Sequence, residues 1–302
     1  MTKYLVTGAF GYSGKYITKK LLANGDNVAT LVGDPSHRSP FGGRIKAMAY
    51  DFENPERMVD KFKDIDIFIN TYYVRFNHGE TTFDKAVENT KILIDSAKEA
   101  GVKRIVHVSI TNPSKNSRYP YFRGKARIEE AIRSSGIPYT ILRPPLLFGY
   151  DGILINNIAW ILRNYPLFMI PGNGEYKVQP VFVEDLADAA ILESKKKGNK
   201  VLSIIGPETF TYNDLISIIA NKVKSSAHIV NINAGVVLLA SRILSLFLHD
   251  VVLTSDEVNA MKDNLLFVKD GFKARTKFTE WINENSGVVG RKYISELERH
   301  FK

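Results

Sequence analysis

The sequence predicts an α/β fold, a doubly wound parallel sheet with a smaller, mainly helical C-terminal lobe. Short apolar runs alternate with amphipathic segments through the first half of the chain. The runs are almost continuously apolar, as in strands that helices cover on both faces. A glycine-rich turn joins the first run to the first helical segment. We expect the sheet domain at 1–150 and a smaller substrate or partner lobe at 151–302, interleaved with the sheet near 178–206.

The first half contains six predicted strands, each an apolar run bounded by turn residues: 3–7, 27–32, 44–50, 64–71, 103–110 and 138–143. Apolar residues at helical spacing predict helices between them, over 16–25, 54–62, 81–101 and 121–136. The pattern changes after residue 150. A strand, a helix and a strand are expected over 178–183, 184–195 and 200–206, and a mainly helical pattern begins at Thr211.

Composition excludes several kinds of site. The chain has 302 residues, of which 44% are hydrophobic, and a formal net charge of +9, which suits an anionic ligand without selecting one. It has no cysteine, so disulfides, thiolate nucleophiles and cysteine-based metal sites are excluded. The six histidines show no metal-type pairing, and no metal is expected. The densest basic run, 195–200, follows a predicted helix and is interpreted as a solvated helix end. No nucleic-acid partner is therefore expected.

Two features of the sequence bear on where the protein is located. The chain enters a predicted strand at once, without a secretory signal, and we expect a cytoplasmic protein. The stretch from Ala234 to Asp250 is short for a membrane span and carries Arg242. We expect it to be a packed helix. An interfacial helix that makes a peripheral membrane contact is the less favoured alternative.

The segment "TGAFGYSG" is the strongest functional motif of the sequence. Its three glycines join a strand to a helix at the start of a βαβ unit, as a dinucleotide-binding loop requires. Gly8 would allow the tight turn, Gly11 would let the backbone approach a pyrophosphate, and Gly14 would let the helix pack close to the strand. The helix N-terminus would add free N–H groups and a positive dipole. The alternative is a glycine-rich turn that binds no ligand.

This octet resembles the T-G-A-x-G-[YF]-[IL]-G fingerprint of extended and atypical short-chain dehydrogenases/reductases. The resemblance continues through "YDFENPE", "KILIDSAKEAGVKRIVHVS", "YFRGKARIEEAI", "GIPYTILRPPLLFG", "VFVEDLADAA" and "GPETFTYNDLI", and so covers most of the chain. The segment "LTSDEVNAMKDNL" is similar to the branch that includes an accessory subunit of respiratory complex I. The resemblance implies a Rossmann-type fold and an NAD(P) cofactor. It does not supply a substrate.

The resemblance also implies a set of cofactor contacts. Asp51 and Phe52 would flank the adenine, and Lys125 would hold the nicotinamide ribose. The complete expected set is Gly8, Phe10, Gly11, Tyr12, Ser13, Gly14, Arg38, Asp51, Phe52, Thr71, Tyr72, Lys125, Pro144 and Leu146. The acid that would indicate NAD and the base that would indicate NADP are both absent, because these positions are Val32 and Gly33. Arg38 favours NADP slightly, whereas Asp34 favours NAD.

Tyr121 and Lys125 are the predicted catalytic pair. They lie four residues apart on a predicted helix and therefore face the same way. A nearby ammonium favours the phenolate form of a tyrosine, which could then exchange a proton with an alcohol or carbonyl. In the resembled family this pair accompanies hydride transfer. The alternative is a tyrosine and a lysine on the surface of an amphipathic helix.

The third catalytic residue is less defined. The family usually shows two adjacent hydroxyl residues after the fifth strand, the second of which polarises the substrate. Here Ser109 matches the first, Ile110 occupies the second, and Thr111 follows. Either hydroxyl could take the role after a small backbone shift, and loss of this donor would slow catalysis strongly. Alternatively, both are turn residues at the end of a strand.

Two further segments depart from the family pattern. In the helix over 81–101, Ala86 takes the position of a frequent asparagine and Asn89 that of a glycine. After the fourth strand the family usually has small residues, whereas this chain reads "NTYYVRFNHG". Tyr72, Tyr73 and Phe76 could wall a substrate cleft, with Arg75 facing an anionic group, or these aromatic rings could pack in the core or in a lid.

Two functions of different classes remain. The first is an NAD(P)-dependent oxidoreductase or epimerase acting on a small alcohol or carbonyl substrate, with a nucleotide sugar as one candidate. For a nucleotide sugar, Arg163, Lys177 and Arg275 are candidate contacts of the diphosphate. The second is a non-catalytic NADP(H)-binding protein that docks to a partner or a membrane, which Ile110 and the apolar stretch at 234–250 favour. The Tyr121–Lys125 pair distinguishes them, because binding alone does not need it.

Overall fold

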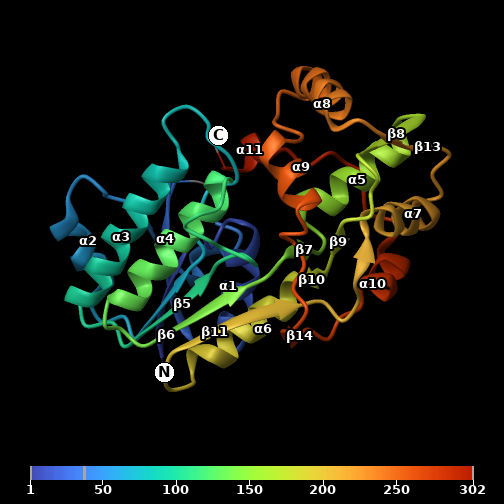
Figure 1. Cartoon of the computed structure of the whole chain (residues 1–302). Helices are drawn as coiled ribbons and strands as arrows, with labels where there is room; N and C mark the ends of the chain where they lie inside the picture. Colours follow the sequence, from blue (N-terminus) through green and yellow to red (C-terminus); the bar gives the residue numbers. More distant parts are fainter. Residues whose placement is uncertain (1, 37–38, 301–302) are drawn as a thin grey trace. The chain divides into compact units, whose positions relative to one another are not determined.

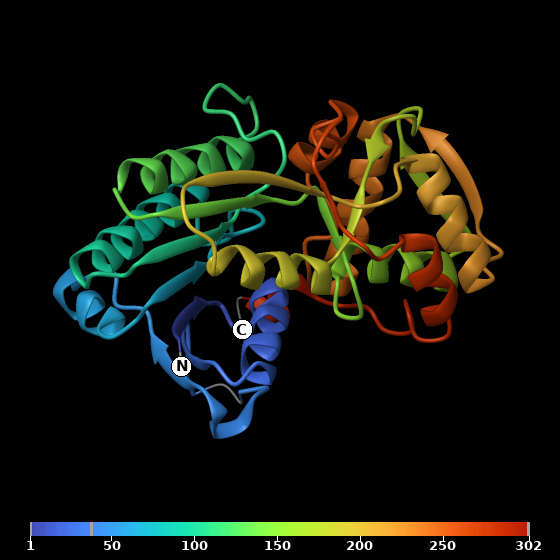
Figure 2. The same cartoon turned by 90° about the horizontal axis from the view of Figure 1, so that it is seen from below.

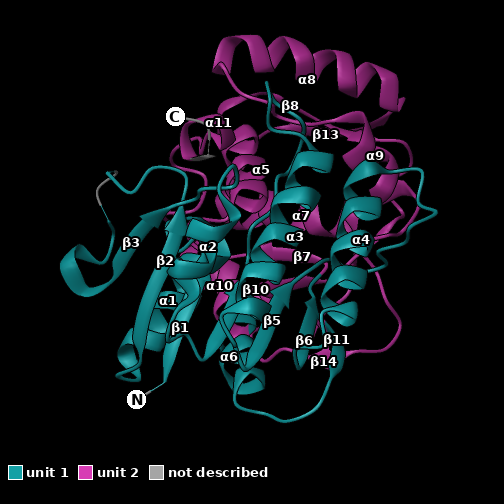
Figure 3. Cartoon of the chain, turned by 90° about the vertical axis from the view of Figure 1, so that its left-hand side faces the viewer, with its two compact units in different colours: residues 1–144, 186–203 teal, residues 145–185, 204–302 magenta. Residues whose placement is uncertain are grey.

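The computed structural model describes residues 2–36 and 39–300 (Figure 1). Its contacts divide the chain into two compact units. The first comprises Met1–Pro144 and Leu186–Ser203, and the second comprises Pro145–Asp185 and Ile204–Lys302 (Figure 3). The chain therefore leaves the first unit after Pro144 and returns to it for most of helix α6 (Val183–Ser194) and of strand β11 (Lys200–Ile205). Each unit has its own hydrophobic core.

A parallel sheet forms the centre of the first unit. Its strands are β1 (Lys3–Thr7), β2 (Asn27–Val32), β3 (Lys46–Ala49), β4 (Ile67–Asn70), β5 (Arg104–Val108), β6 (Tyr139–Arg143) and β11 (Lys200–Ile205). Their order is β3-β2-β1-β4-β5-β6-β11, and every neighbouring pair is parallel. An eighth strand, β14 (Phe272–Lys273), pairs with Ile204 and Ile205 at the end of β11. The predicted doubly wound parallel sheet is confirmed.

Helices cover both faces of this sheet, as Figure 2 shows. α2 (Pro55–Phe62), α3 (Phe83–Glu99) and α4 (Pro120–Ser134) pack on one face, where Leu5, Phe68 and Ile105 meet Val87 and Ile128 in the core. α1 (Tyr12–Ala23) and α6 (Val183–Ser194) lie on the other face, joined by the ion pair of Lys20 with Asp188 at 2.6 Å. A short 3₁₀ turn spans Gly42–Arg44. Coverage on both faces explains why the strands are apolar throughout.

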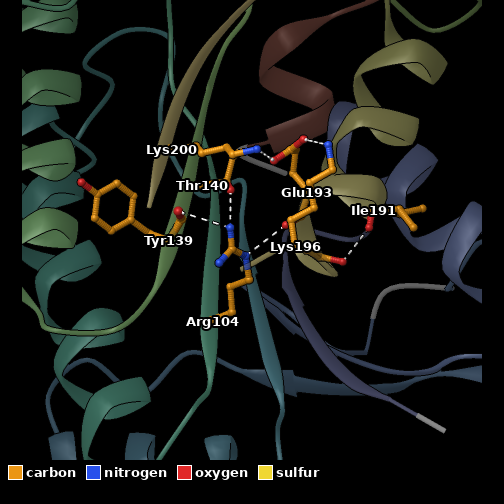
Figure 4. A network of polar contacts seen from close by, with 8 residues as sticks. Arg104, Tyr139, Thr140, Ile191, Glu193, Lys196 and Lys200 are labelled. Carbon is orange, nitrogen blue, oxygen red and sulfur yellow. Dashed lines mark hydrogen bonds and ion pairs between the residues drawn. The ribbon is translucent and has the colours of Figure 1, made fainter. Parts of the chain in front are cut away.

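A buried arginine fixes the end of α6 to the sheet (Figure 4). The guanidinium of Arg104 donates to the main-chain carbonyls of Glu193 and Gly198 at 3.0 Å each and to Thr140 Oγ1 at 2.6 Å. The carboxylate of Glu193 accepts from Lys196 at 2.6 Å and lies 3.9 Å from Lys200. The cationic side chain thus meets the negative end of the helix dipole. Two lysines of the basic run at 195–200 consequently have an intramolecular partner.

The second unit combines short strand pairs with helices. Its elements are β7 (Leu146–Phe148), α5 (Ile153–Asn164), β8 (Leu167–Pro171), β9 (Lys177–Val178), β10 (Pro180–Phe182), β12 (Phe210–Thr211), α7 (Tyr212–Val223), β13 (His228–Ile232), α8 (Ala234–Leu248), α9 (Ser255–Lys262), α10 (Phe278–Asn285) and α11 (Glu296–His300). The strands pair as β10 with β7, β12 with β9 and β13 with β8. Phe148, Phe278 and Trp281 stack edge to face in the core of this unit.

Helix α8 is packed less tightly than its apolar sequence predicted. Only Val237 and Ser241 of this helix are buried. Five large apolar side chains of the helix are exposed: Val236, Leu239, Ile243, Leu246 and Phe247. Phe247 is 77% exposed, so the packed-helix expectation holds for one side of α8 alone. Among the residues that the structure describes, no helix combines the length and the hydropathy that crossing a bilayer would require.

Candidate functional site

The glycine loop joins β1 to α1 at the point where the strand order of the sheet reverses. Gly8 has a φ of +65°, a left-handed conformation that glycine adopts without strain. A Cβ on Gly14 would lie 2.2 Å from the carbonyl oxygen of Gly8, so only glycine fits there. Gly11 caps α1 without a side chain, and the first turn of this helix has no acidic residue. The N-terminus of α1 is therefore suited to an anion.

The loop after β4 lies against this glycine loop. Thr71 Oγ1 donates to the carbonyl of Thr7 at 2.6 Å, and Thr71 N–H donates to Thr7 Oγ1 at 2.9 Å. A Cβ on Gly8 would lie 3.3 Å from Thr71 Oγ1, so the two loops are in close contact. The structure thus brings together two of the predicted cofactor segments at the carboxyl ends of adjacent strands. Open α/β sheets bind ligands at such a position.

Three polar side chains form a row across β1, β4 and β5 under this position. Thr7 Oγ1 donates to Asn70 Oδ1 at 2.9 Å, and Tyr72 N–H donates to the same oxygen at 3.0 Å. Asn70 Nδ2 consequently faces His107 Nδ1, at 3.2 Å, and the imidazole nitrogen accepts. The neutral ring therefore carries its proton on Nε2. Burial, and secondly the charge of Lys125, hold the pKa of His107 well below its usual range.

An aromatic cluster lies at the ends of β3 and β4. Tyr50 and Phe52 stack with ring centroids 4.9 Å apart, and Tyr72 contacts both rings at 5.2 and 5.8 Å. Tyr72 Oη accepts from Asn89 Nδ2 at 2.9 Å, which gives Asn89 a structural partner at the position where the family has glycine. Asp51 accepts from Asn54 Nδ2 at 2.7 Å. Asp51, Phe52 and Tyr72 therefore belong to one neighbourhood, as a shared adenosine contact would require.

The predicted catalytic pair lies on α4. Tyr121 is half-buried near the start of the helix, and Lys125, one turn later, is 3% exposed. Lys125 Nζ donates to the carbonyl of Val108 at the end of β5, at 2.9 Å. Burial lowers the pKa of this lysine to about 7, against the opposing effect of Glu129. The ammonium is thus held by the sheet and shielded from solvent.

The two candidate hydroxyl residues are both buried. Ser109 is 4% exposed and donates to Glu129 Oε1 at 2.6 Å. Glu129 also accepts from Arg143 Nε at 2.9 Å and from Arg133 Nη2 at 3.3 Å. Thr111 is fully buried, and its N–H donates to the carbonyl of Pro144 at 3.2 Å. Ile110 is 9% exposed. The proton of the Ser109 hydroxyl is therefore already directed to a carboxylate.

The remaining predicted residues are distributed as follows. Phe10, Tyr12 and Ser13 are half-buried in or next to the glycine loop. Phe76 is 6% exposed. It therefore packs in the core, which was one of the two expected alternatives, and does not line a cleft. Leu146 is buried in the core of the second unit. Arg38 lies outside the described residues. Among the residues that the structure describes, no group of three His, Asp or Glu side chains could hold a metal ion.

Sequence reasoning missed two groups of residues beside the pair. The first is Glu129, which contacts Ser109 and two arginines. Its position four residues after Lys125 puts it on the same side of the helix, and this spacing could have indicated its place in the site. The second is the contact of Tyr73 with Gly124. A glycine inside a helix costs about 1 kcal/mol relative to alanine and usually has a packing reason, which was a further unused signal.

Comparison with known proteins relates the first unit to dinucleotide-binding proteins. Residues 8–153 match the sequence model of an NAD(P)H-binding family. A mitochondrial protein of Arabidopsis thaliana, NADH dehydrogenase (ubiquinone) 1 alpha subcomplex subunit 9, is 25% identical over 230 residues. This match spans 72% of the present chain and 57% of the plant protein, so it covers little more than half of that protein's length.

Solved structures with a similar fold include two enzymes. An NADPH-dependent quinone oxidoreductase from Escherichia coli, complexed with NADPH, gives a TM-score of 0.74 at 19% identity, covering 94% of this chain and 98% of that one. A UDP-N-acetylglucosamine 4-epimerase from Bacillus cereus gives a TM-score of 0.70 at 17% identity, covering 97% and 98%. Residues 8–153 thus match an NAD(P)H-binding family and fold as a Rossmann-type domain, and the chain as a whole has the same fold as these two enzymes.

Proposed function

We propose that this chain is an NAD(P)H-dependent oxidoreductase or epimerase of the short-chain dehydrogenase type, acting on an alcohol or carbonyl. The observation that carries the proposal is the arrangement of α4. Lys125 is anchored to the end of β5 by Val108, and Tyr121 lies one turn earlier on the same helix. The pair is thereby placed at the carboxyl edge of the sheet, the edge that also carries the glycine loop. Tyr121 would give a proton to, or take one from, the substrate oxygen.

The residues present fit a dinucleotide. The left-handed Gly8, the close contact at Gly14 and the uncapped N-terminus of α1 would accommodate the diphosphate. Asp51, Phe52, Thr71 and Tyr72 would contact the adenosine half, and Arg38 would favour NADP. When bound, the cofactor supplies or accepts the hydride. Lys125, which would hold the nicotinamide ribose, is only 3% exposed.

The nucleotide-sugar form of this proposal has less support. Arg163 was a candidate for the diphosphate, but its guanidinium donates to the main-chain carbonyls of Val289, Val223 and Ser286. Its role in the second unit is accordingly structural. A small carbonyl or quinone substrate carries no diphosphate and needs no such cationic contact. The E. coli structure with the same fold is a quinone oxidoreductase.

A non-catalytic NAD(P)H-binding protein is the second candidate. The contact of Ser109 with Glu129 favours it, because one of the two hydroxyls that could polarise a substrate already donates to a carboxylate. The similarity to a subunit of NADH dehydrogenase agrees with this candidate. Under this proposal the exposed apolar side of α8 would face a protein partner or a membrane surface. The two candidates share the cofactor and differ in turnover.

Binding should be measured first, by titration calorimetry of NADPH and NADH on the wild type, Gly11→Val and Arg38→Ala. We expect binding of at least one form, weakened by the valine side chain, and a preference for NADPH that Arg38→Ala removes. No binding at high micromolar concentration would overturn both candidates. Where binding is found, oxidation of bound NADPH is followed at its absorbance band with a series of quinones and ketones. Turnover that Tyr121→Phe abolishes supports the enzyme, and absence of turnover with every acceptor favours the second candidate.

A further inference from the structure

The side chain of Tyr73 leaves the loop after β4 and lies against the first turns of α4. Its hydroxyl donates to the carbonyl of Tyr121 at 3.1 Å. Its ring meets that of Tyr121 edge to face at 5.1 Å and stacks near Phe83 at 6.0 Å. Burial raises the pKa of Tyr73 above its usual value, so the phenol keeps its proton and donates. Tyr73 is therefore held by its ring and its hydroxyl at once.

Gly124 makes room for this hydroxyl. A Cβ at Gly124 would lie 2.0 Å from Tyr73 Oη and 3.2 Å from its Cζ. No alanine fits beside the phenol without displacing it. The glycine inside α4, which is unfavourable for the helix alone, is explained by this close approach. The hydroxyl of Tyr73 thus occupies the space that a side chain at Gly124 would need.

The same ring faces the ammonium of Lys125. The Nζ atom lies 4.4 Å from the centroid of Tyr73, within the range of a cation–π contact. Taking a lysine head out of water costs several kcal/mol unless other groups replace the lost hydration. Here the carbonyl of Val108 and the ring face replace part of it. The charged and titratable groups near the ammonium are Glu129 of α4, His107 of β5 and the phenol of Tyr73, whose ring also meets that of Tyr121.

We infer that Tyr73 is a positioning residue for Lys125: its ring holds the ammonium beside Tyr121, and Gly124 provides the seat for its hydroxyl. The inference rests on the proposed function only for the role of Lys125 in proton transfer. Its geometric part concerns residues of one unit and requires neither cofactor nor substrate. It also gives the bulky segment at 72–73, where the resembled family has small residues, a defined place in the site.

The first test is the titration of Lys125, observed by NMR in protein with isotope-labelled lysine ε-carbons and assigned by its loss in Lys125→Met. Tyr73→Phe keeps the ring and should leave the titration midpoint of Lys125 unchanged. Tyr73→Leu removes the ring face and should lower the midpoint by about half a pH unit or more, because the charged form loses a favourable contact. An unchanged or raised midpoint in Tyr73→Leu, or an equal shift in Tyr73→Phe, would overturn the inference.

The second test is a double-mutant cycle on thermal unfolding of the apo protein. Gly124→Ala should lower Tm by about 2–6 °C, since the methyl group collides with the phenol oxygen. Adding Tyr73→Phe removes that oxygen and should restore at least half of the loss. Gly287→Ala is the matched control, because no atom lies within 4 Å of the added Cβ. A defect in Gly124→Ala that Tyr73→Phe does not relieve would show that Gly124 serves another purpose.

Both tests are read on the apo protein, so they separate the inference from the proposed function. Failure of dinucleotide binding in the wild type removes the proposed function and leaves the Tyr73–Gly124 cycle to be judged by its own outcome. Conversely, wild-type binding combined with an unrelieved Gly124→Ala defect removes the inference and leaves the proposed function standing.

Discussion

Ser109 and Glu129 are joined by a short hydrogen bond inside the first unit, with the serine hydroxyl donating to Oε1 at 2.6 Å. Glu129 is 3% exposed and forms an ion pair with Arg143, whose Nη2 lies 2.5 Å from Oε2. A buried carboxylate of this kind is a strong acceptor. Ser109, one of the two hydroxyl residues that could polarise a substrate, is thereby part of the interior of the protein.

Ser109→Ala should therefore act on stability. Removing a hydrogen bond to a charged, buried acceptor costs about 1.5–3 kcal/mol of the free energy of unfolding. Urea denaturation measures this loss, with Ser36→Ala as an exposed control that should stay within about 0.5 kcal/mol of the wild type. Unaltered stability together with a large fall in turnover would instead place the Ser109 hydroxyl on the substrate.

Tyr121→Phe should abolish turnover and leave dinucleotide binding intact. The phenol is the proposed proton donor, and loss of general acid catalysis lowers kcat by about 10²–10⁴-fold. Steady-state NADPH oxidation with the best acceptor measures kcat, and calorimetry measures affinity. Tyr119→Phe is the control, because this neighbouring tyrosine is 4% exposed and its side chain makes no capping hydrogen bond to the helix. Equal turnover in wild type and Tyr121→Phe would rule out Tyr121 as the proton donor.

The burial of Lys125 predicts a pH dependence of stability. Burial lowers its pKa to about 7 in the folded protein, whereas an unfolded lysine titrates near its usual value. Between these values the unfolded state binds the additional proton, so the free energy of unfolding rises with pH from about 7 to about 10. Lys125 contributes at most about 1.4 kcal/mol per pH unit to this slope.

Lys125→Met tests this dependence. We expect a shallower increase in stability between neutral and alkaline pH, and a higher stability than the wild type below pH 7, where the wild type must bury a charge. Urea titrations at several pH values give both quantities. Parallel pH profiles of the two proteins would mean that the ammonium remains hydrated in the folded state.

Much of the first unit could be predicted from the sequence, because local and tertiary preferences agree there. The strand at 3–7 and the turn at Gly8 follow from apolar runs and glycine chemistry, and the structure has β1 at Lys3–Thr7. α1 begins at Tyr12, four residues before the predicted start, because Gly14 packs inside the helix instead of preceding it. The periodicity of apolar residues does not reveal that a helical turn containing glycine is stabilised by its contact with a strand.

The polar interior of the site could not be predicted in the same way. Thr7 and Asn70 stand at the ends of β1 and β4 and His107 lies within β5, and only the strand order places the three side by side. The exposure of one side of α8 also could not be predicted. Its sequence is apolar on nearly every side, so hydropathy could not tell that Leu246 and Phe247 would be exposed.

Gly14→Ala weighs two opposing effects in the glycine loop. Alanine favours a helix interior by about 1 kcal/mol over glycine. The added Cβ would lie 2.2 Å from the carbonyl oxygen of Gly8, and a main-chain atom cannot move aside as a flexible side chain can. Overpacking of this kind costs about 1–3 kcal/mol or more, so the collision wins. We expect lower stability and a loop that is displaced from its contact with Thr71.

The displacement should reach the cofactor. Calorimetry below the unfolding temperature should show at least about tenfold weaker dinucleotide binding in Gly14→Ala, because the diphosphate contacts of the loop and the N-terminus of α1 separate. Gly43→Ala is the matched control, with no atom within 4 Å of the new Cβ, and should bind as the wild type does. A folded Gly14→Ala with wild-type affinity would show that the dinucleotide is bound elsewhere, since no diphosphate could remain seated on a loop whose main chain has been pushed off the strand.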